Sequence, residues 1–219
     1  PDILVLRTEH PLSAGLCKKV ANFCNVSPDA VFQSPDMPSI YQVPVCMQDQ
    51  GIDRVILEKL GLPVGETPSL GPWRAFLDRR ANATEELHIG LVGKYDLQDA
   101  YKSIIEALQQ AGVYNDRKVR CHFINAENIT RENVGKMLEG MAGYVICPGF
   151  GQRGTEGKLI ATQYCRENDL PTFGICLGMQ MMVIEFARNV LGYTDANSTE
   201  LNSKTSHNVI DIMEEQKNI

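Results

Sequence analysis

The second part of the sequence repeats one pattern four times, a short apolar strand followed by a helix. The strands are expected at residues 89–92, 119–124, 144–147 and 171–175. We expect Asp99 to cap the first helix, which stops at Gly112, and we expect the second helix at residues 130–138. Strands joined by helices in this way lie parallel, with helices on both faces of the sheet. The pattern therefore predicts an α/β fold.

Cys176 lies at the corner between the fourth strand and the helix that follows it. Apolar residues recur at helical spacing beyond the cysteine, and Gly192 is a stop signal for this helix. The free N–H groups and the positive end of the helix dipole would stabilise a thiolate at this corner. Gly174 and Gly178 would let substrate and backbone approach closely. A buried cysteine is more often an inert apolar side chain, but this context favours a nucleophile.

Two unusual loops are expected to meet at one edge of the sheet. One is the glycine-rich loop after Cys147, and the other is the corner at Cys176. Ligands of parallel sheets bind at the carboxyl ends of the strands, where both loops should emerge. The sequence therefore predicts a single crevice that carries the chemistry.

Charge and cysteine content limit the classes of function. The formal net charge of -6 argues against broad binding of nucleic acid, because that requires a basic face. The seven cysteines show no paired metal-ligand spacing, which indicates reduced thiols in a cytoplasmic protein. No apolar run approaches the length of a membrane span, and the start of the sequence is typical of a core strand rather than a signal peptide. A sequence that opens inside a strand without methionine is interpreted as part of a longer protein.

The chain is expected to consist of two blocks with a linker between them. Residues 1–62 begin with a strand at 3–6 and a helix opened by Ser13. Residues 63–86 begin with a proline- and glycine-rich stretch that is typical of an interdomain linker, and Trp73 could attach it to a domain surface. Residues 87–219 contain the strand-helix units.

Several strings resemble a known family. The string Gly174-Ile175-Cys176-Leu177-Gly178-Met179-Gln180 resembles the nucleophile elbow of class I glutamine amidotransferases. Other strings resemble the CTP synthases within this class: Gly93-Lys94-Tyr95, Gly149-Phe150-Gly151-Gln152-Arg153-Gly154, Glu156-Gly157-Lys158, Ala196-Asn197-Ser198-Thr199-Glu200 and Ser39-Ile40-Tyr41-Gln42-Val43-Pro44. The similarity extends over nearly the whole chain.

The resemblance implies a flavodoxin-like parallel sheet for residues 87–219, the amidotransferase domain. It implies that residues 1–62 are the C-terminal part of a P-loop-type α/β amidoligase domain. The implied reaction is the ATP-dependent amination of UTP to CTP, with magnesium, with GTP as allosteric activator and with ammonia from glutamine. The family generally forms homotetramers in the cytoplasm.

The resemblance also assigns roles in glutamine hydrolysis. Cys176 would attack the glutamine side chain and form a glutamyl thioester. The oxyanion would be held by the backbone N–H groups of Leu177 and Gly149. Where many relatives have two consecutive glycines, an alignment without a gap places Pro148 at the first one, and proline has no N–H to donate. The glutamine-binding residues implied are Gly149, Leu177, Gly178, Met179, Gln180 and Glu200.

Nucleotide sites are implied in both blocks. Phe150 and Arg153 match positions near the GTP site, where an aromatic face and a guanidinium could contact a base. The alternative is that Phe150 caps the core and Arg153 is solvated. Lys19 matches a lysine that contacts UTP or CTP, and Asp36 and Met37 match a segment that contacts the adenine of ATP.

Two features of the family are not found in the sequence. The family has a His-x-Glu pair that supplies the base for the thiol, but no histidine here is followed two places later by glutamate or aspartate. The P-loop that would bind the phosphates of ATP is not found either. We therefore interpret the chain as an internal segment that hydrolyses glutamine poorly or not at all by itself. Two alternatives stay open: the glutaminase component of another amidotransferase, such as GMP or anthranilate synthase, and a non-catalytic binding or assembly module.

Overall fold

The computed structural model describes residues 1–95 and 98–216 of the chain. These residues form two compact units, Pro1–Asn82 and Ala83–Ile219, and each is described by itself. No helix among the described residues combines the length and the apolar character needed to cross a membrane.

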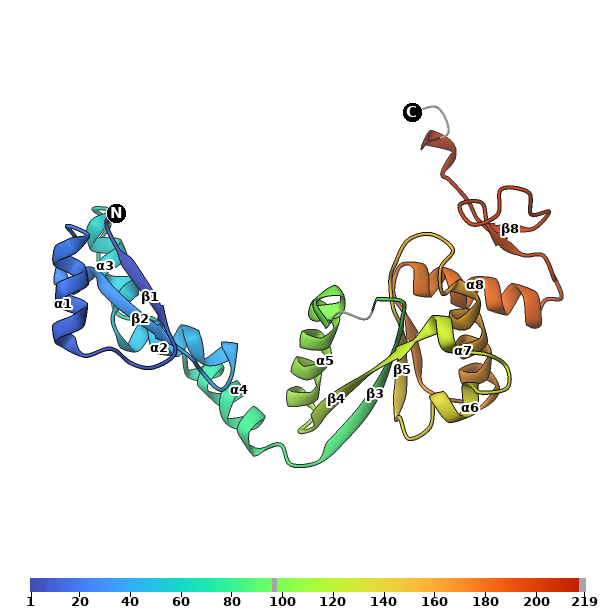
Figure 1. The fold of residues 1–219 in the computed structure, drawn as a ribbon, viewed down its shortest axis with the longest axis horizontal. Helices are drawn as coiled ribbons and strands as arrows, with labels where there is room; N and C mark the ends of the chain where they lie inside the picture. Colours follow the sequence, from blue (N-terminus) through green and yellow to red (C-terminus); the bar gives the residue numbers. More distant parts are fainter. Residues whose placement is uncertain (96–97, 217–219) are drawn as a thin grey trace. The chain divides into compact units, whose positions relative to one another are not determined.

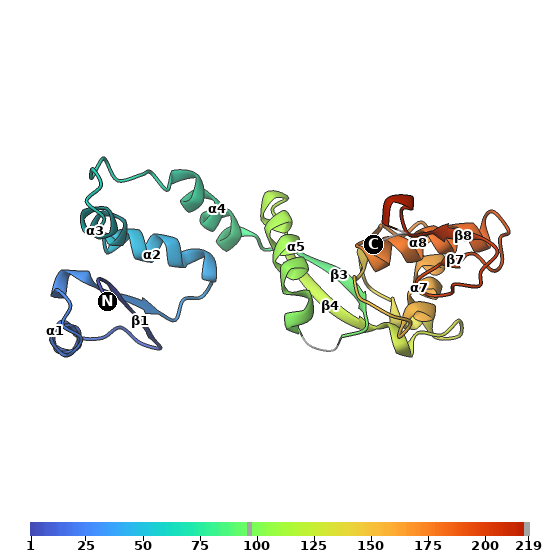
Figure 2. The same cartoon turned by 90° about the horizontal axis from the view of Figure 1, so that it is seen from above.

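The first unit is built on two parallel strands, β1 (Leu4–Thr8) and β2 (Val31–Pro35). Helix α1 (Ala14–Phe23) connects them, and the Ser13 side chain caps it by accepting a hydrogen bond from the Leu16 N–H, as the sequence predicts. Helices α2 (Val43–Asp49), α3 (Ile52–Lys59) and α4 (Gly71–Asn82) complete the unit (Figures 1 and 2).

Helix α4 occupies half of the segment that was expected to be a linker. Pro72 stands in its first turn, where a missing N–H costs nothing. The Trp73 indole donates a hydrogen bond to the Tyr41 carbonyl at 2.8 Å and stacks on Phe76 with ring centroids 5.6 Å apart. Trp73 therefore attaches α4 to the first unit. The division of the chain into domains at residues 62 and 86 stays a prediction.

The second unit contains a four-stranded parallel sheet in the order β4-β3-β5-β6. Its strands are β3 (Glu86–Gly93), β4 (Lys118–Asn125), β5 (Gly143–Ile146) and β6 (Thr172–Gly174). Helix α5 (Lys102–Tyr114) covers one face, and α6 (Val134–Met137) and α7 (Thr155–Glu167) cover the other (Figure 1). The predicted α/β fold, with a parallel sheet between two layers of helices, is confirmed. The strand order is flavodoxin-like, and it reverses between β3 and β5.

Two of the predicted helix boundaries in this unit are wrong. Asp99 lies inside a 3-10 turn, Gln98–Tyr101, and Tyr101 is the residue that precedes α5. Gly112 is inside α5 instead of ending it, and it is not among the glycines with the positive φ of a helix end. A Cβ there would lie 2.7 Å from the Arg117 carbonyl oxygen. This glycine serves helix packing and does not terminate the helix.

The predicted helix at residues 130–138 is much shorter in the structure. Only Val134–Met137 are helical, as α6. The preceding residues form a turn in which the Asn133 side chain accepts a hydrogen bond from the Thr130 N–H at 2.8 Å. Such side-chain bonds to the backbone compete with helix formation.

Candidate active site at the edge of the sheet

Cys176 is the residue that joins β6 to helix α8 (Leu177–Asn189), and its backbone is strained. Its φ of 52° and ψ of -113° lie outside the regions that non-glycine residues ordinarily adopt. Such conformations cost about 1–3 kcal/mol and persist only where the surroundings impose them. Here the Ile175 N–H donates to the Ile146 carbonyl at 3.0 Å, and the Gln180 N–H donates to the Cys176 carbonyl at 3.1 Å. The corner therefore has the geometry of a nucleophile elbow.

Gly174 and Gly178 make this corner possible through backbone packing. A Cβ on Gly178 would overlap the carbonyl oxygen of Ile146 in β5. A Cβ on Gly174 would lie 2.7 Å from the backbone of Gly178 and Met179. The first turn of α8 thus presses directly against the sheet, which agrees with the expected close approach of the backbone.

Cys176 is the exposed thiol among the seven cysteines, all of which lie in the described residues. Cys147 and Cys165 are buried, and burial raises the pKa of both thiols, that of Cys147 to about 12. A thiol with so high a pKa is almost wholly protonated at neutral pH and is a poor nucleophile. Of the three cysteines in this part of the sheet, Cys176 is therefore the accessible one and the best candidate for a nucleophile.

The loop at residues 147–151 follows β5 and starts beside the corner. The Cys147 N–H continues the sheet by donating to the Val92 carbonyl at 2.9 Å. Among the described residues, neither the Leu177 N–H nor the Gly149 N–H has a recorded hydrogen-bond partner. Both N–H groups are therefore available to a ligand.

Two lysines that the sequence analysis did not single out support this loop. Lys158, in α7, is fully buried, and its ammonium donates to the Cys147 carbonyl at 2.6 Å. Lys94, directly after β3, is 3% exposed, and its ammonium donates to the carbonyls of Phe150 and Gly151. Both lysines fall within the strings Gly93-Lys94-Tyr95 and Glu156-Gly157-Lys158, but only the structure shows that they are buried.

The candidate glutamine-binding residues of α8 surround its first turn. Leu177 and Gly178 are buried and Met179 is 47% exposed. The Gln180 side-chain oxygen is buried without a hydrogen-bond partner among the described residues. A buried amide oxygen without a partner is expensive, and a donor from a bound ligand would satisfy it.

Glu200 comes from a more distant segment, after β7 (Asn197–Ser198), which pairs with β8 (Asn208–Ile210). Its side chain is exposed, and its N–H donates to the Ser198 hydroxyl at 3.2 Å. The next residue, Leu201, packs against the buried cluster that includes Leu177. The Gln152 side chain also donates to the Leu201 carbonyl at 2.7 Å, so the segment lies beside both the glycine-rich loop and α8.

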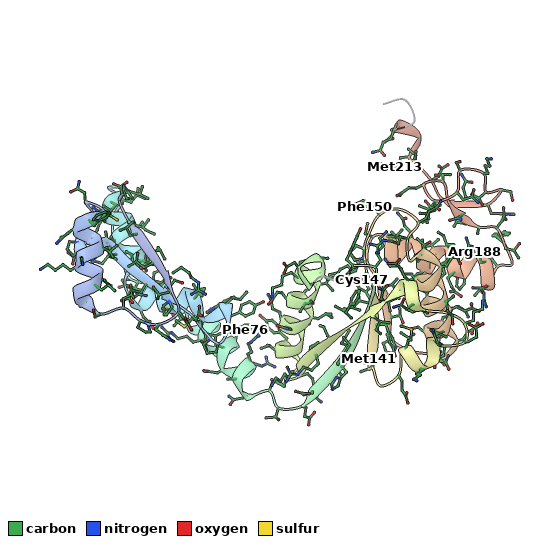
Figure 3. The ribbon with its side chains drawn as sticks, in the orientation of Figure 1. Phe76, Met141, Cys147, Phe150, Arg188 and Met213 are labelled. Atoms are coloured by element: carbon green, nitrogen blue, oxygen red, sulfur yellow. The ribbon has the colours of Figure 1, made fainter. Side chains whose placement is uncertain are left out.

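Phe150 and Arg153 both follow β5 in the chain, on the way to α7. Phe150 is 81% exposed and projects from the loop, so it does not cap the core (Figure 3). The Arg153 guanidinium forms an ion pair with Glu127 and lies over the Tyr95 ring, 5.6 Å from its centroid. An exposed ring could stack on a flat ligand, and a guanidinium could bind its negative charge.

The candidate nucleotide residues of the first unit are spread over two places. Lys19 is exposed on α1. Asp36 and Met37 follow β2, where Asp36 forms an ion pair with Arg7 and Met37 lines a groove of about 660 Å³ between α2 and α4. No recorded contact joins Lys19 to the other two among the described residues.

None of the four histidines has a recorded contact with Cys176 in the described part of the chain. His88 and His122 form a pair with nitrogens 2.7 Å apart on β3 and β4. His207 lies 2.5 Å from Asp195, and hydrogen bonds from Ser206 and then from His207 hold the pKa of the Asp195 carboxyl well below its usual range. No three His, Cys, Asp or Glu side chains among the described residues gather as metal ligands.

A strained, exposed cysteine that joins the last strand of a parallel sheet to a helix points to the class I glutamine amidotransferases. The family model for class-I glutamine amidotransferases matches residues 96–218, and the chain belongs to this family. A second family model, described as the CTP synthase N-terminus, matches residues 1–62.

Curated relatives and one solved structure refine the comparison. The whole chain is 68% identical to a CTP synthase of Bacteroides thetaiotaomicron and 57% identical to one of Porphyromonas gingivalis. It spans only 41% of the length of each of these relatives. The solved glutaminase domain of Trypanosoma brucei CTPS with bound acivicin is 37% identical, with a TM-score of 0.55 over 58% of this chain and 50% of that one.

Proposed function

We propose that this chain is part of a glutamine-hydrolysing CTP synthase and carries the nucleophile of its glutaminase site, Cys176. The strained and exposed position of Cys176 at the sheet edge is the observation that supports this role. The match of residues 1–62 to the CTP synthase N-terminus favours this enzyme over other amidotransferases, which share only the elbow.

In the proposed glutaminase step, the Cys176 sulfur forms a bond to the side-chain carbonyl carbon of glutamine. The carbon–nitrogen bond breaks, the nitrogen takes up a proton and leaves as ammonia, and water then hydrolyses the thioester to glutamate. The N–H groups of Leu177 and Gly149 would hold the oxyanion, and loss of one such donor typically costs about 2.7–4 kcal/mol of barrier. Gln180 and Glu200 would bind the polar groups of glutamine.

The nucleotide roles rest on the resemblance and on the positions of the side chains. ATP would supply the phosphoryl group that activates UTP for attack by ammonia, with Asp36 and Met37 near the adenine and Lys19 near UTP or CTP. Phe150 and Arg153 would contact the activator GTP. We assign no residue of this chain to magnesium, and we propose a cytoplasmic homotetramer for the intact enzyme.

Covalent labelling of the chain tests the nucleophile. We expect an electrophilic glutamine analogue such as acivicin to modify Cys176 once per chain, because this thiol is exposed and flanked by unpaired N–H groups. Intact mass and peptide mapping would measure the site, and excess glutamine should slow the reaction.

The variant Cys176→Ala should abolish this labelling, and Cys24→Ala, which changes a half-buried thiol in the first unit, serves as the matched control. Modification that is spread over several cysteines, or that survives in C176A, would contradict the proposed role and favour a non-catalytic module.

A further inference from the structure

Two buried ammonium groups end on the same five-residue loop, residues 147–151. Burying a charged group is costly unless it is hydrogen-bonded. Lys158 reaches the loop from α7, with its Nζ 2.6 Å from the Cys147 carbonyl oxygen and 3.5 Å from the Pro148 carbonyl oxygen. Lys94 reaches it from the end of β3 and binds the carbonyls of Phe150 and Gly151. The lysines thus contact the carbonyls on both sides of Gly149.

The contact at Pro148 affects the direction of the Gly149 N–H. The Pro148 carbonyl and the Gly149 N–H belong to one planar trans peptide, so they point in opposite directions. An ammonium near the carbonyl oxygen favours the orientation in which this N–H points away from Lys158. Pro148 has no N–H and Gly149 has no side chain, so the loop offers few other groups that could fix this peptide.

The side chain of Lys94 also restricts the loop sterically. A Cβ on Gly149 would lie 2.7 Å from Lys94 Cε, so the lysine stem packs directly against this glycine. Figure 3 shows the loop between Cys147, near the end of β5, and Phe150. The loop is therefore held from two elements that are distant in sequence, β3 and α7.

We propose that Lys158 is a positioning residue for glutamine hydrolysis, which orients the Pro148–Gly149 peptide so that the Gly149 N–H faces the developing oxyanion. This role rests on the proposed function. Lys94 supports the same loop from the opposite side. Burial lowers the pKa of Lys158 to about 8, so the group is still mostly an ammonium at pH 7 and its hydrogen bonds are charge-assisted.

The test uses the full-length enzyme that contains this chain. Lys158→Met keeps the volume of the side chain but removes the donor, and Lys136→Met, at an exposed lysine of α6, is the matched control. We expect K158M to lower kcat for glutamine hydrolysis on the order of 100-fold, with a small change in KM, as for loss of one oxyanion donor. We expect K136M to behave like the wild type.

Two further measurements separate positioning from other effects. CTP synthesis with added ammonia bypasses glutamine hydrolysis, so it should be unchanged in K158M if the enzyme is folded. Alkylation of Cys176 by iodoacetamide needs no oxyanion site, so its rate should also be unchanged. A parallel loss of all three rates, or a wild-type kcat, would overturn the proposal. If K158M does not fold, Lys158→Leu, which also removes the donor but has a shorter side chain, is subjected to the same measurements and criteria.

Cys176→Ala distinguishes this inference from the proposed function. Glutamine hydrolysis that survives in C176A contradicts the function itself. Loss of hydrolysis in C176A together with full activity in K158M contradicts only the role of Lys158.

Discussion

Lys158 illustrates how a single buried charge links the stability of the fold to the site. Its ammonium is fully buried under the loop that follows β5, and it is stabilised there by the Cys147 carbonyl. Burial disfavours the charged form and lowers the pKa from 10.5 to about 8. Keeping this ammonium charged and buried at neutral pH therefore lowers the stability of the folded state.

This pKa predicts a pH dependence of stability. Between about pH 8 and 10.5 the unfolded chain binds the Lys158 proton and the folded chain does not, so the free energy of unfolding should rise with pH. The difference in the free energy of unfolding between the wild type and Lys158→Met should shift in favour of the wild type by up to about 3 kcal/mol over this range. Urea unfolding followed by circular dichroism at several pH values would measure it.

The comparison with K158M is needed because the titration of the Cys147 thiol changes the free energy of unfolding in the opposite direction. Burial raises the pKa of that thiol from 9.0 to about 12, so its contribution to stability is lost as the pH rises above 9. Burial, the largest cause, is common to both proteins, whereas the smaller lowering of this pKa by the Lys158 charge is absent from K158M. A difference between wild type and K158M that stays constant from pH 7.5 to 10 would show that Lys158 titrates normally.

The start of helix α8 is defined by its contact with the sheet. Gly178 is the second residue of α8, and it leaves no room for a Cβ beside the Ile146 carbonyl. Gly15 is the second residue of α1, and nothing lies within 4 Å of the place where its Cβ would be. The same residue type at the same helical position thus has opposite structural roles.

This contrast predicts opposite effects of substitution by alanine. Gly178→Ala should destabilise the second unit by about 3 kcal/mol or more, because α8 must move away from β5. Gly15→Ala should stabilise the first unit by about 0.5–1 kcal/mol, because alanine favours the helix. Fluorescence of Trp73, the one tryptophan of the chain, would follow unfolding of the first unit. Circular dichroism would follow unfolding of both units. Equal effects of the two substitutions would contradict the packing argument.

The chain divides its candidate residues between two compact units. The proposed nucleophile, the loop at residues 147–151 and the two buried lysines belong to the second unit, whereas Lys19, Asp36 and Met37 belong to the first. The resemblance implies a His-x-Glu pair as the general base, and no such pair is found in this sequence. The 219 residues therefore contain the proposed nucleophile and the proposed oxyanion donors but no identified base.

We accordingly expect the isolated chain to release glutamate from glutamine slowly or not at all. A coupled glutamate assay would measure the rate, with Cys176→Ala as the background. Fast release that disappears in C176A would show that the chain contains a base that we have not identified.

The local pattern of the sequence was sufficient for the order of strands and helices in the second unit, for the cap at Ser13 and for the corner at Cys176. These features depend on short-range signals: apolar periodicity, a capping side chain, and glycines beside a cysteine. The positions and ends of helices were less predictable. Gly112 is a stop signal in isolation, but in the structure it lies inside α5 and packs against the Arg117 backbone. Helix α4 lies in a segment that was expected to be a linker, and Trp73 attaches it to Tyr41.

The burial of Lys94 and Lys158 was decided only by the tertiary structure. Nothing in a sequence distinguishes a solvated lysine from a buried one, since burial depends on which carbonyls the fold brings within reach. Lys94 meets its partners 56 and 57 residues away, where the ends of β3 and β5 come together. The local sequence pattern therefore specified the strands and the corner at Cys176, and long-range packing specified which charges support the loop at residues 147–151.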